Sequence, residues 1–258
     1  MTEILVHDIM SKPVTIAKSA PLTDALQKML REGVDPLIAV HNDTVVGTVS
    51  RRSIAEKLGS KKTSDLAPTA IHVANVVNDD FTIVYADQEI DILIALLQAG
   101  AKLAIVYDSD NNLIGQVTYG DLLQRLRPSS SLLETTEKPY LMDAGERIVH
   151  FRRVMMDENV SHIIAMKDGA VAGIVSETDI AVAMRRFREA VPEKHQDTQV
   201  RNLLAEGIMT SPVITMDLSA GLDAVVATLL EKKISAIPIT ESGKVVGILT
   251  RKSAIMAL

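Results

Sequence analysis

The 258-residue chain contains no cysteine and no tryptophan. The absence of cysteine excludes disulfides, thiolate metal sites and a cysteine nucleophile, and it fits a reducing, cytoplasmic setting. Aromatic residues make up only 3% of the sequence, and the formal net charge is -6. Nucleic-acid binding depends on cationic contacts to phosphate and on aromatic stacking. We therefore expect no nucleic acid among the partners.

Long apolar runs and catalytic motifs are also missing. The best candidate for a membrane span, 92–107, is interrupted by Gln98, Gly100 and Lys102 and falls short of the roughly 18 apolar residues required. The N-terminus lacks the basic start and apolar segment of a signal peptide, so we expect no membrane partner. There is no Walker-type phosphate loop, no histidine pair with metal-site spacing and no nucleophile with a matched base. We predict no catalytic residue, no metal and no catalytic cofactor.

One motif recurs four times along the chain. Each copy reads apolar-x-Gly, two residues, Ser or Thr, two residues, then Asp or Ser, and its glycines are Gly47, Gly115, Gly173 and Gly247. An apolar stripe with helical spacing begins 25 residues before each glycine, at Leu22, Ile90, Ile148 and Leu222. A motif that returns in register with an amphipathic helix indicates an internal repeat.

Each helical stripe precedes a short apolar strand, a polar turn and a second strand that carries the motif. The first of these strands is predicted at 36–40, 103–107, 162–166 and 236–240. Another helix follows the motif, so each repeat is βαββα and the fold class is α+β. An isolated unit of about 55–60 residues would have a marginal core, so the units are expected to pair.

Polar connectors divide the repeats at 57–68, 127–138 and 188–199. The second connector is the strongest candidate for a linker between domains. We therefore predict two domains, 1–127 with repeats at about 1–60 and 68–127, and 128–258 with repeats at about 136–190 and 198–258.

The ordered combination of "DIMSKPVTI" (8–16), an amphipathic helix, "AIPIT" (236–240) and "VVGILTRKS" (245–253) resembles the CBS domain family, named after cystathionine beta-synthase. The resemblance covers nearly the whole chain as four motifs in two tandem pairs, or Bateman modules. Its plan is similar to the gamma subunit of AMP-activated protein kinase and to archaeal four-motif proteins. It implies that paired units pack sheet to sheet about a pseudo-twofold axis. The clefts of such pairs bind AMP, ADP, ATP or S-adenosylmethionine.

The resemblance also implies binding roles. The motif aspartate holds the ribose diol, which maps to Asp121 and Asp179, because a carboxylate can accept from two adjacent hydroxyls. Phosphate contacts map to the motif hydroxyls and to the cations of repeats one and four, namely Thr118, Ser176, Ser50, Thr250, Arg51, Arg52, Arg251 and Lys252. Adenine contacts map to Thr82, Ile83, Leu141, His162 and Ile164.

Repeats one and four depart from this pattern, because Ser53 and Ser253 stand where the aspartate is expected. Each predicted pair therefore contains one acidic and one cationic motif. The sequence predicts one strong nucleotide site per pair. Asp121 would act with Arg51 or Arg52, and Asp179 with Arg251 or Lys252.

Simpler interpretations stay open. Thr118-x-x-Asp121 and Ser176-x-x-Asp179 also fit a helix capping box, and the cations could be solvated helix starts. The favoured hypothesis is a non-catalytic, energy-sensing protein that binds an adenine nucleotide as regulatory ligand and signals to an unidentified regulated protein. An assembly module with degenerate clefts is the alternative, and a nucleotide-hydrolysing enzyme is a third. The pairs are expected to form a flat disc, within one chain or in a homodimer.

Overall fold

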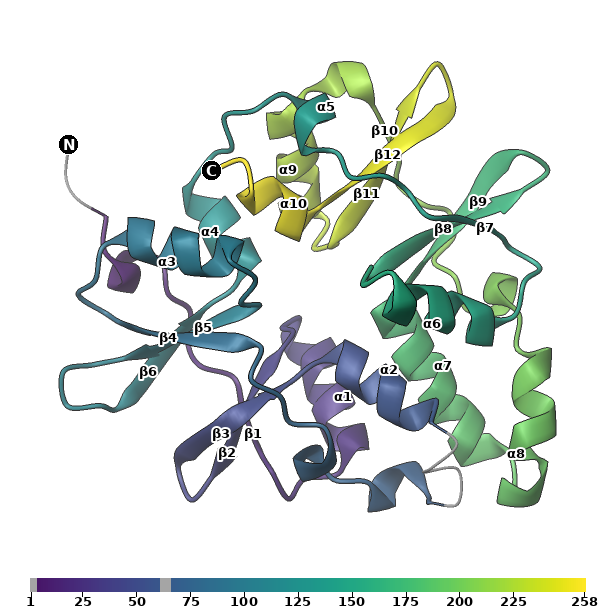
Figure 1. Ribbon diagram of the computed structural model, residues 1–258, viewed down its shortest axis with the longest axis horizontal. Helices are drawn as coiled ribbons and strands as arrows, with labels where there is room; N and C mark the ends of the chain where they lie inside the picture. Colours follow the sequence, from purple (N-terminus) through teal and green to yellow (C-terminus); the bar gives the residue numbers. More distant parts are fainter. Residues whose placement is uncertain (1–3, 61–65) are drawn as a thin grey trace. The chain divides into compact units, whose positions relative to one another are not determined.

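The computed structural model describes residues 4–60 and 66–258 (Figure 1). It contains four three-stranded sheets, and each sheet belongs to one sequence repeat. In these residues no helix has both the length and the apolar character needed to cross a membrane. The α+β fold with four βαββα repeats is confirmed.

The same elements recur in each repeat. Repeat one contains β1 (Thr15–Ala17), α1 (Leu22–Glu32), β2 (Leu37–His41), β3 (Thr44–Val49) and α2 (Arg51–Leu58). Repeat two contains β4 (Phe81–Tyr85), α3 (Ile90–Gln98), β5 (Leu103–Tyr107), β6 (Leu113–Val117) and α4 (Tyr119–Arg125). Repeat three contains β7 (Leu141–Asp143), α6 (Ile148–Asp157), β8 (His162–Lys167), β9 (Ala170–Ser176) and α7 (Glu177–Ala190). Repeat four contains β10 (Met216–Asp217), α9 (Leu222–Glu231), β11 (Ala236–Glu241), β12 (Lys244–Thr250) and α10 (Arg251–Ile255).

The first helix of each repeat begins where the apolar stripe predicted, at Leu22, Ile90, Ile148 and Leu222. In repeats two, three and four this helix connects two parallel strands, as α3 connects β4 to β5, and β5 then pairs antiparallel with β6. Parallel neighbours need a long crossover, whereas a tight turn can join antiparallel strands. The polar turn and the amphipathic helix thus account for the order of strands in each sheet.

The chain divides into two compact units, and neither is continuous in sequence. Unit 1 comprises Met1–Thr15, Asn78–Lys138 and Thr215–Leu258, and it holds repeats two and four. Unit 2 comprises Ile16–Val77 and Pro139–Ile214, and it holds repeats one and three. The predicted pairs at 1–127 and 128–258 group the repeats differently, and that division stays a prediction.

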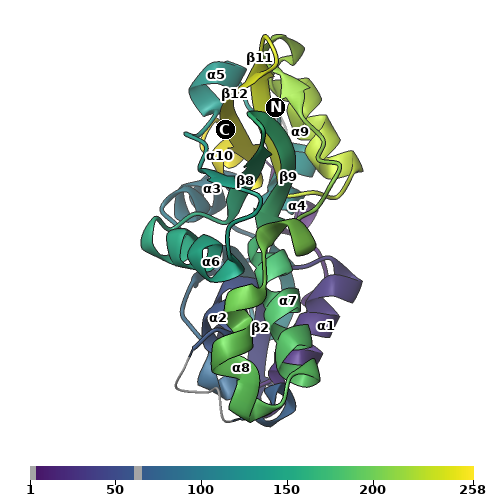
Figure 2. The same ribbon diagram turned by 90° about the vertical axis from the view of Figure 1, so that its right-hand side faces the viewer.

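In each unit the motif helices of the two repeats pack against each other. In unit 1, α10 packs against α4, and Leu122 and Ile255 are fully buried in the core. In unit 2, α2 packs along the 14-residue α7, which also contacts α1 and α6 (Figures 1 and 2). This packing brings the helix starts of two different motifs into the same unit.

The segment 127–138, predicted as a linker, is a folded part of unit 1, which corrects that prediction. It contains α5 (Leu132–Thr135), which starts with a capping box between Ser131 and Glu134 and buries Leu132 in the core. The connector predicted at 188–199 is also mostly helical, because α7 runs into it and α8 (Glu193–Gln199) follows. The connector at 57–68 includes 61–65, which lie outside the described residues.

Candidate functional site

Asp121 and Asp179 both cap the helix in which they lie, and they do so with one oxygen. The Thr118 backbone N–H and hydroxyl donate to Asp121 Oδ2 at 2.7 and 2.6 Å. Ser176 makes the same two bonds to Asp179 Oδ2 at the same distances. In the described part of the chain, neither Oδ1 accepts a hydrogen bond from another residue. Capping therefore leaves one charged acceptor on each carboxylate available for a ligand.

Repeats one and four build the same cap without a carboxylate. Ser53 Oγ accepts from the Ser50 backbone N–H at 3.1 Å and donates to the Ser50 carbonyl at 2.9 Å. Ser253 makes the equivalent bonds with Thr250 at 3.0 and 3.1 Å. All four motifs thus cap a helix, but only repeats two and three carry a negative charge beyond what capping requires.

In unit 2, Arg51 of repeat one lies near the Asp179 carboxylate of repeat three. Its Nη2 donates to the Met29 carbonyl at 3.2 Å, whereas its buried Nε has no hydrogen-bond partner among the described residues. Burial raises the pKa of Asp179, while the bonds from Ser176 and the charge of Arg51 oppose that rise. Unit 2 therefore combines a carboxylate with a spare oxygen and a cation with a spare donor.

His162 lies on the strand next to Ser176, because the two residues are paired between β8 and β9. Its Nδ1 is 2.8 Å from the Ser161 hydroxyl. Burial, and secondly the charge of Arg51, lower the pKa of His162 to about 4. The ring is therefore neutral near pH 7, where it can accept or donate hydrogen bonds without adding to the positive charge of Arg51.

We expect His162 to make the protein less stable in acid. Its folded-state pKa of about 4 lies below the ordinary value of 6.5, so protonation favours the unfolded chain. The contribution of neutral His162 to the free energy of unfolding should be fully present above about pH 6.5. It should be lost progressively toward pH 4, by up to about 3 kcal/mol. Denaturant unfolding between pH 7 and 4 should show a shallower decline for His162→Asn than for the native protein. The control His41→Asn, at an exposed site, should keep the native slope, and equal slopes for both variants would contradict the assignment.

Arg52, the other predicted cation of repeat one, is held by protein groups. Its Nε pairs with Glu177 at 2.5 Å, and its Nη1 and Nη2 donate to the Asn159 side chain and the Val160 carbonyl at 2.8 and 3.1 Å. A phosphate at Arg52 would have to replace some of these bonds. Arg51 is therefore the better placed of the two cations for a ligand.

Unit 1 has a similar arrangement at the start of α4. Arg251 of repeat four is anchored by its Nη2 to the Leu229 carbonyl at 3.2 Å and by its Nε to the Ile234 carbonyl at 3.0 Å. A Cβ added at Gly120 would lie 3.0 Å from Arg251 Nη1, so this guanidinium lies against the backbone next to Asp121. Lys252 is exposed.

Within each unit an aspartate therefore has an arginine of the other repeat near it, Arg51 for Asp179 and Arg251 for Asp121. The sequence predicted other combinations, Asp121 with Arg51 or Arg52 and Asp179 with Arg251 or Lys252. Those combinations join residues of different units, and they stay predictions.

The Thr250 hydroxyl of repeat four, predicted to contact phosphate, already has an acidic partner. It donates to Glu137 Oε2 at 3.0 Å, while the Glu137 backbone exchanges two hydrogen bonds with Ile248 on β12. A Cβ at Gly247 would collide with the Thr136 methyl group at 1.9 Å, so 136–137 fits closely onto this strand. An anion at Thr250 would meet the Glu137 carboxylate, which disfavours a phosphate there.

Three segments of the chain, 6–60, 73–128 and 205–258, match the family model described as CBS domain. Together they make up more than half of the sequence. The chain belongs to the CBS domain family. The repeat that the family model does not match, repeat three, has the same βαββα order as the other CBS repeats.

Three proteins illustrate the relationship. The uncharacterised protein MJ1404 of Methanocaldococcus jannaschii is 24% identical over 264 residues, which are 95% of this chain, although the chain spans only 60% of that protein. MJ1225 of the same organism is 21% identical over 94% of this chain and 92% of its own length. The crystal structure of MJ1225, proposed as an archaeal homologue of g-AMPK, covers 98% of this chain and 99% of its own with a TM-score of 0.80. The crystal structure of a conserved protein of Pyrococcus horikoshii, 17% identical, covers 98% of this chain and 99% of its own with a TM-score of 0.62. At these identities the likeness shows the fold.

The positions predicted to contact adenine in CBS repeats two and three differ in exposure. Ile83 and Leu141 occupy equivalent places, paired with Ile105 and Ile164 on the middle strands, and they are 51% and 47% exposed. Ile164 is fully buried, and Thr82 is half-buried. Ile83 and Leu141 are two exposed apolar side chains at matching positions, and they offer surface to a flat base. Ile164 is the buried strand partner of Leu141. The adenine assignment stays a prediction.

Proposed function

We propose that the chain is a non-catalytic regulatory protein that binds adenosine-containing ligands and passes their occupancy to a protein partner. The observation that carries the proposal is the spare Oδ1 of Asp121 and of Asp179, which capping does not use. A ribose diol presents two adjacent hydroxyl donors, and a carboxylate is a strong acceptor for them. Repeats one and four provide an internal contrast, because their serine caps have no such charge.

The phosphate of the ligand would lie near the arginine of the same unit. Arg51 is fixed by the Met29 carbonyl and Arg251 by the Leu229 carbonyl, so little side-chain entropy remains to be lost on binding. The positive end of the helix macrodipole at the starts of α7 and α4 favours an anion as well. The exposed Leu141 and Ile83 would contact the base.

A nucleotide panel tests this function in a thermal unfolding assay. A ligand at 100 times its Kd stabilises the folded state by about 2.7 kcal/mol, which corresponds to a Tm increase of roughly 5–10 °C. We expect AMP, ADP, ATP or S-adenosylmethionine to give such an increase and guanosine and pyrimidine nucleotides to give less. Denatured samples should first be checked by mass spectrometry, so that the protein tested is known to be ligand-free.

Two other outcomes would each replace the proposal. A flat response of ligand-free protein to the whole panel would favour an assembly module whose clefts bind no nucleotide. Release of inorganic phosphate from ATP on prolonged incubation would favour an enzyme, provided that Asp121→Asn or Asp179→Asn abolishes it.

A further inference from the structure

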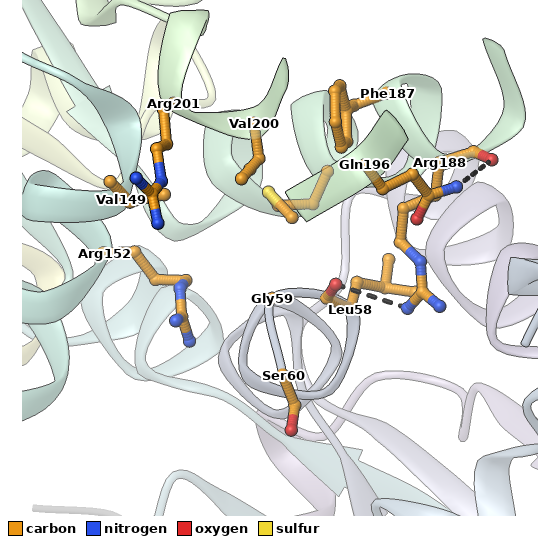
Figure 3. A pocket seen from close by; sticks show the side chains of 11 residues that line it. Leu58, Gly59, Ser60, Val149, Arg152, Phe187, Arg188, Gln196, Val200 and Arg201 are labelled. Carbon is orange, nitrogen blue, oxygen red and sulfur yellow. Dashed lines mark hydrogen bonds between the residues drawn. The ribbon is translucent and has the colours of Figure 1, made fainter. Parts of the chain in front are cut away.

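A pocket of about 320 Å³ lies within unit 2 at the C-terminal end of α2, whereas Arg51 is at the start of that helix. Its wall includes apolar side chains of α6, α7 and the 3-10 helix Val200–Asn202, namely Val149, Phe187 and Val200. Three arginines also line it, Arg152, Arg188 and Arg201. Figure 3 shows Arg152 and Arg201 on one side of Gly59 and Arg188 on the other. The volume is at the lower end of the range for small-molecule sites.

Arg188 has a structural role in this wall. It is only 6% exposed, and its Nη1 and Nη2 donate to the Leu58 and Leu66 carbonyls at 3.3 and 2.6 Å. A cation that donates to the Leu58 carbonyl at the end of α2 also complements the dipole of that helix. The packing of α2 is therefore sufficient to explain Arg188.

Arg152 and Arg201 have no such explanation. Neither forms a hydrogen bond or an ion pair with any residue that the structure describes. Arg152 Nε is buried against Gly59, where an added Cβ would lie 2.6 Å away. Loss of water lowers the pKa of Arg152, and the nearby charge of Glu56 opposes that effect without an ion pair. A partly desolvated cation without a hydrogen-bonded counter-charge is unfavourable.

We propose that this pocket binds a small organic phosphate, with its phosphate group between Arg152 and Arg201 and its apolar body against Val149, Phe187 and Val200. A phosphate monoester carries -1.5 to -2 charges near neutral pH, which matches two guanidinium groups better than a single carboxylate does. Guanidinium groups bind phosphate oxygens through paired, charge-assisted hydrogen bonds. The apolar wall excludes a bare ion as the best ligand, because an ion would leave that surface uncovered.

Phenyl phosphate is the probe for this site, titrated into the full chain and followed by ligand-observed NMR. We expect it to bind more tightly than inorganic phosphate and than benzoate. Losing one guanidinium should weaken binding about tenfold or more, both in Arg152→Met and in Arg201→Met. Arg201 is exposed, so its variant should fold even if Arg152→Met does not. Arg153→Met is the matched control, because Arg153 is the exposed neighbour on α6 that pairs with Asp157, and it should bind normally.

Three results would overturn the proposal. The first is native affinity in Arg201→Met, which would show that the Arg201 guanidinium does not contact the probe. The second is inorganic phosphate binding as tightly as phenyl phosphate. The third is loss of phenyl phosphate binding in Asp179→Asn, because the probe would then lie in the proposed adenosine cleft. If AMP fails to bind while phenyl phosphate binds through Arg201, the pocket stands and the proposed function does not.

Discussion

Asp179→Asn is expected to weaken adenosine-nucleotide binding in unit 2 ten- to a hundredfold while changing the free energy of unfolding little. The Asn side chain retains one carbonyl oxygen that can accept the bonds from the Ser176 backbone and hydroxyl, so the capping box at the start of α7 is kept. It has no second, charged oxygen for the ribose. A hydrogen bond to a charged group is worth about 1.5–3 kcal/mol, and 1.4 kcal/mol corresponds to about tenfold in affinity. Titration calorimetry with native protein and variant would measure the difference.

The matched variants separate ribose binding from capping. Asp121→Asn should have the same effect on the site of unit 1, because Asp121 uses its oxygens in the same way. Ser53→Ala removes the bond from the Ser50 backbone N–H to Ser53 Oγ, which involves no charge, and should cost about 1 kcal/mol of stability without loss of affinity. A 2′-deoxy nucleotide should bind the native protein more weakly than the matching ribonucleotide does. Asp179→Asn should weaken the binding of the deoxy nucleotide only a little further. If Asp179→Asn binds as tightly as native protein, the aspartate is a cap and nothing else.

Arg52→Met should lower the free energy of unfolding by about 3–5 kcal/mol, the range for breaking a buried ion pair by removing one partner. The Arg52 and Glu177 side chains are only 15% and 14% exposed, so the Glu177 carboxylate would lose its cation in a poorly hydrated place. The Asn159 side chain and the Val160 carbonyl would lose a donor at the same time. Chemical denaturation at neutral pH measures the effect.

The surface ion pair between Arg31 and Glu32 provides the comparison. These side chains are 66% and 39% exposed, so Arg31→Met should cost less than about 1 kcal/mol. Adding Glu177→Met to Arg52→Met should restore part of the stability, because an apolar pair often replaces a buried ion pair without loss. Equal costs for Arg52→Met and Arg31→Met would show that the buried pair contributes nothing.

The repeats could be predicted from the sequence because their signals are local. The helix starts at Ile90 and Ile148 follow from apolar spacing, and the strand 103–107 was predicted with its observed bounds. At 127–138 the polar composition suggested a linker, and the short helix α5 in that segment was missed. Ser131-x-x-Glu134 was a readable capping signal there, of the same kind as Thr118-x-x-Asp121.

The arrangement of the repeats could not be predicted in the same way. That α2 packs on α7 and α10 on α4 depends on surfaces contributed by segments more than a hundred residues apart, and no spacing in the chain encodes such a match. The cap at Asp179 was readable, but its single free oxygen and the nearby Arg51 are properties of three-dimensional packing. No sequence pattern predicted the pocket lined by Arg152, Arg188 and Arg201, because its residues come from several separate segments.

The discontinuous composition of unit 1 has a consequence for how the protein is made. Its core includes Val6 near the beginning of the chain and Leu229 and Ile255 near the end, and the Thr250 bond to Glu137 spans 113 positions. Domains that consist of one stretch can fold on the ribosome as soon as that stretch emerges. Unit 1 cannot, because Thr215–Leu258 is synthesised only after residues 139–214, which belong to unit 2. The face of α4 that packs against α9 and α10 stays uncovered until then, and the long-range closure slows folding.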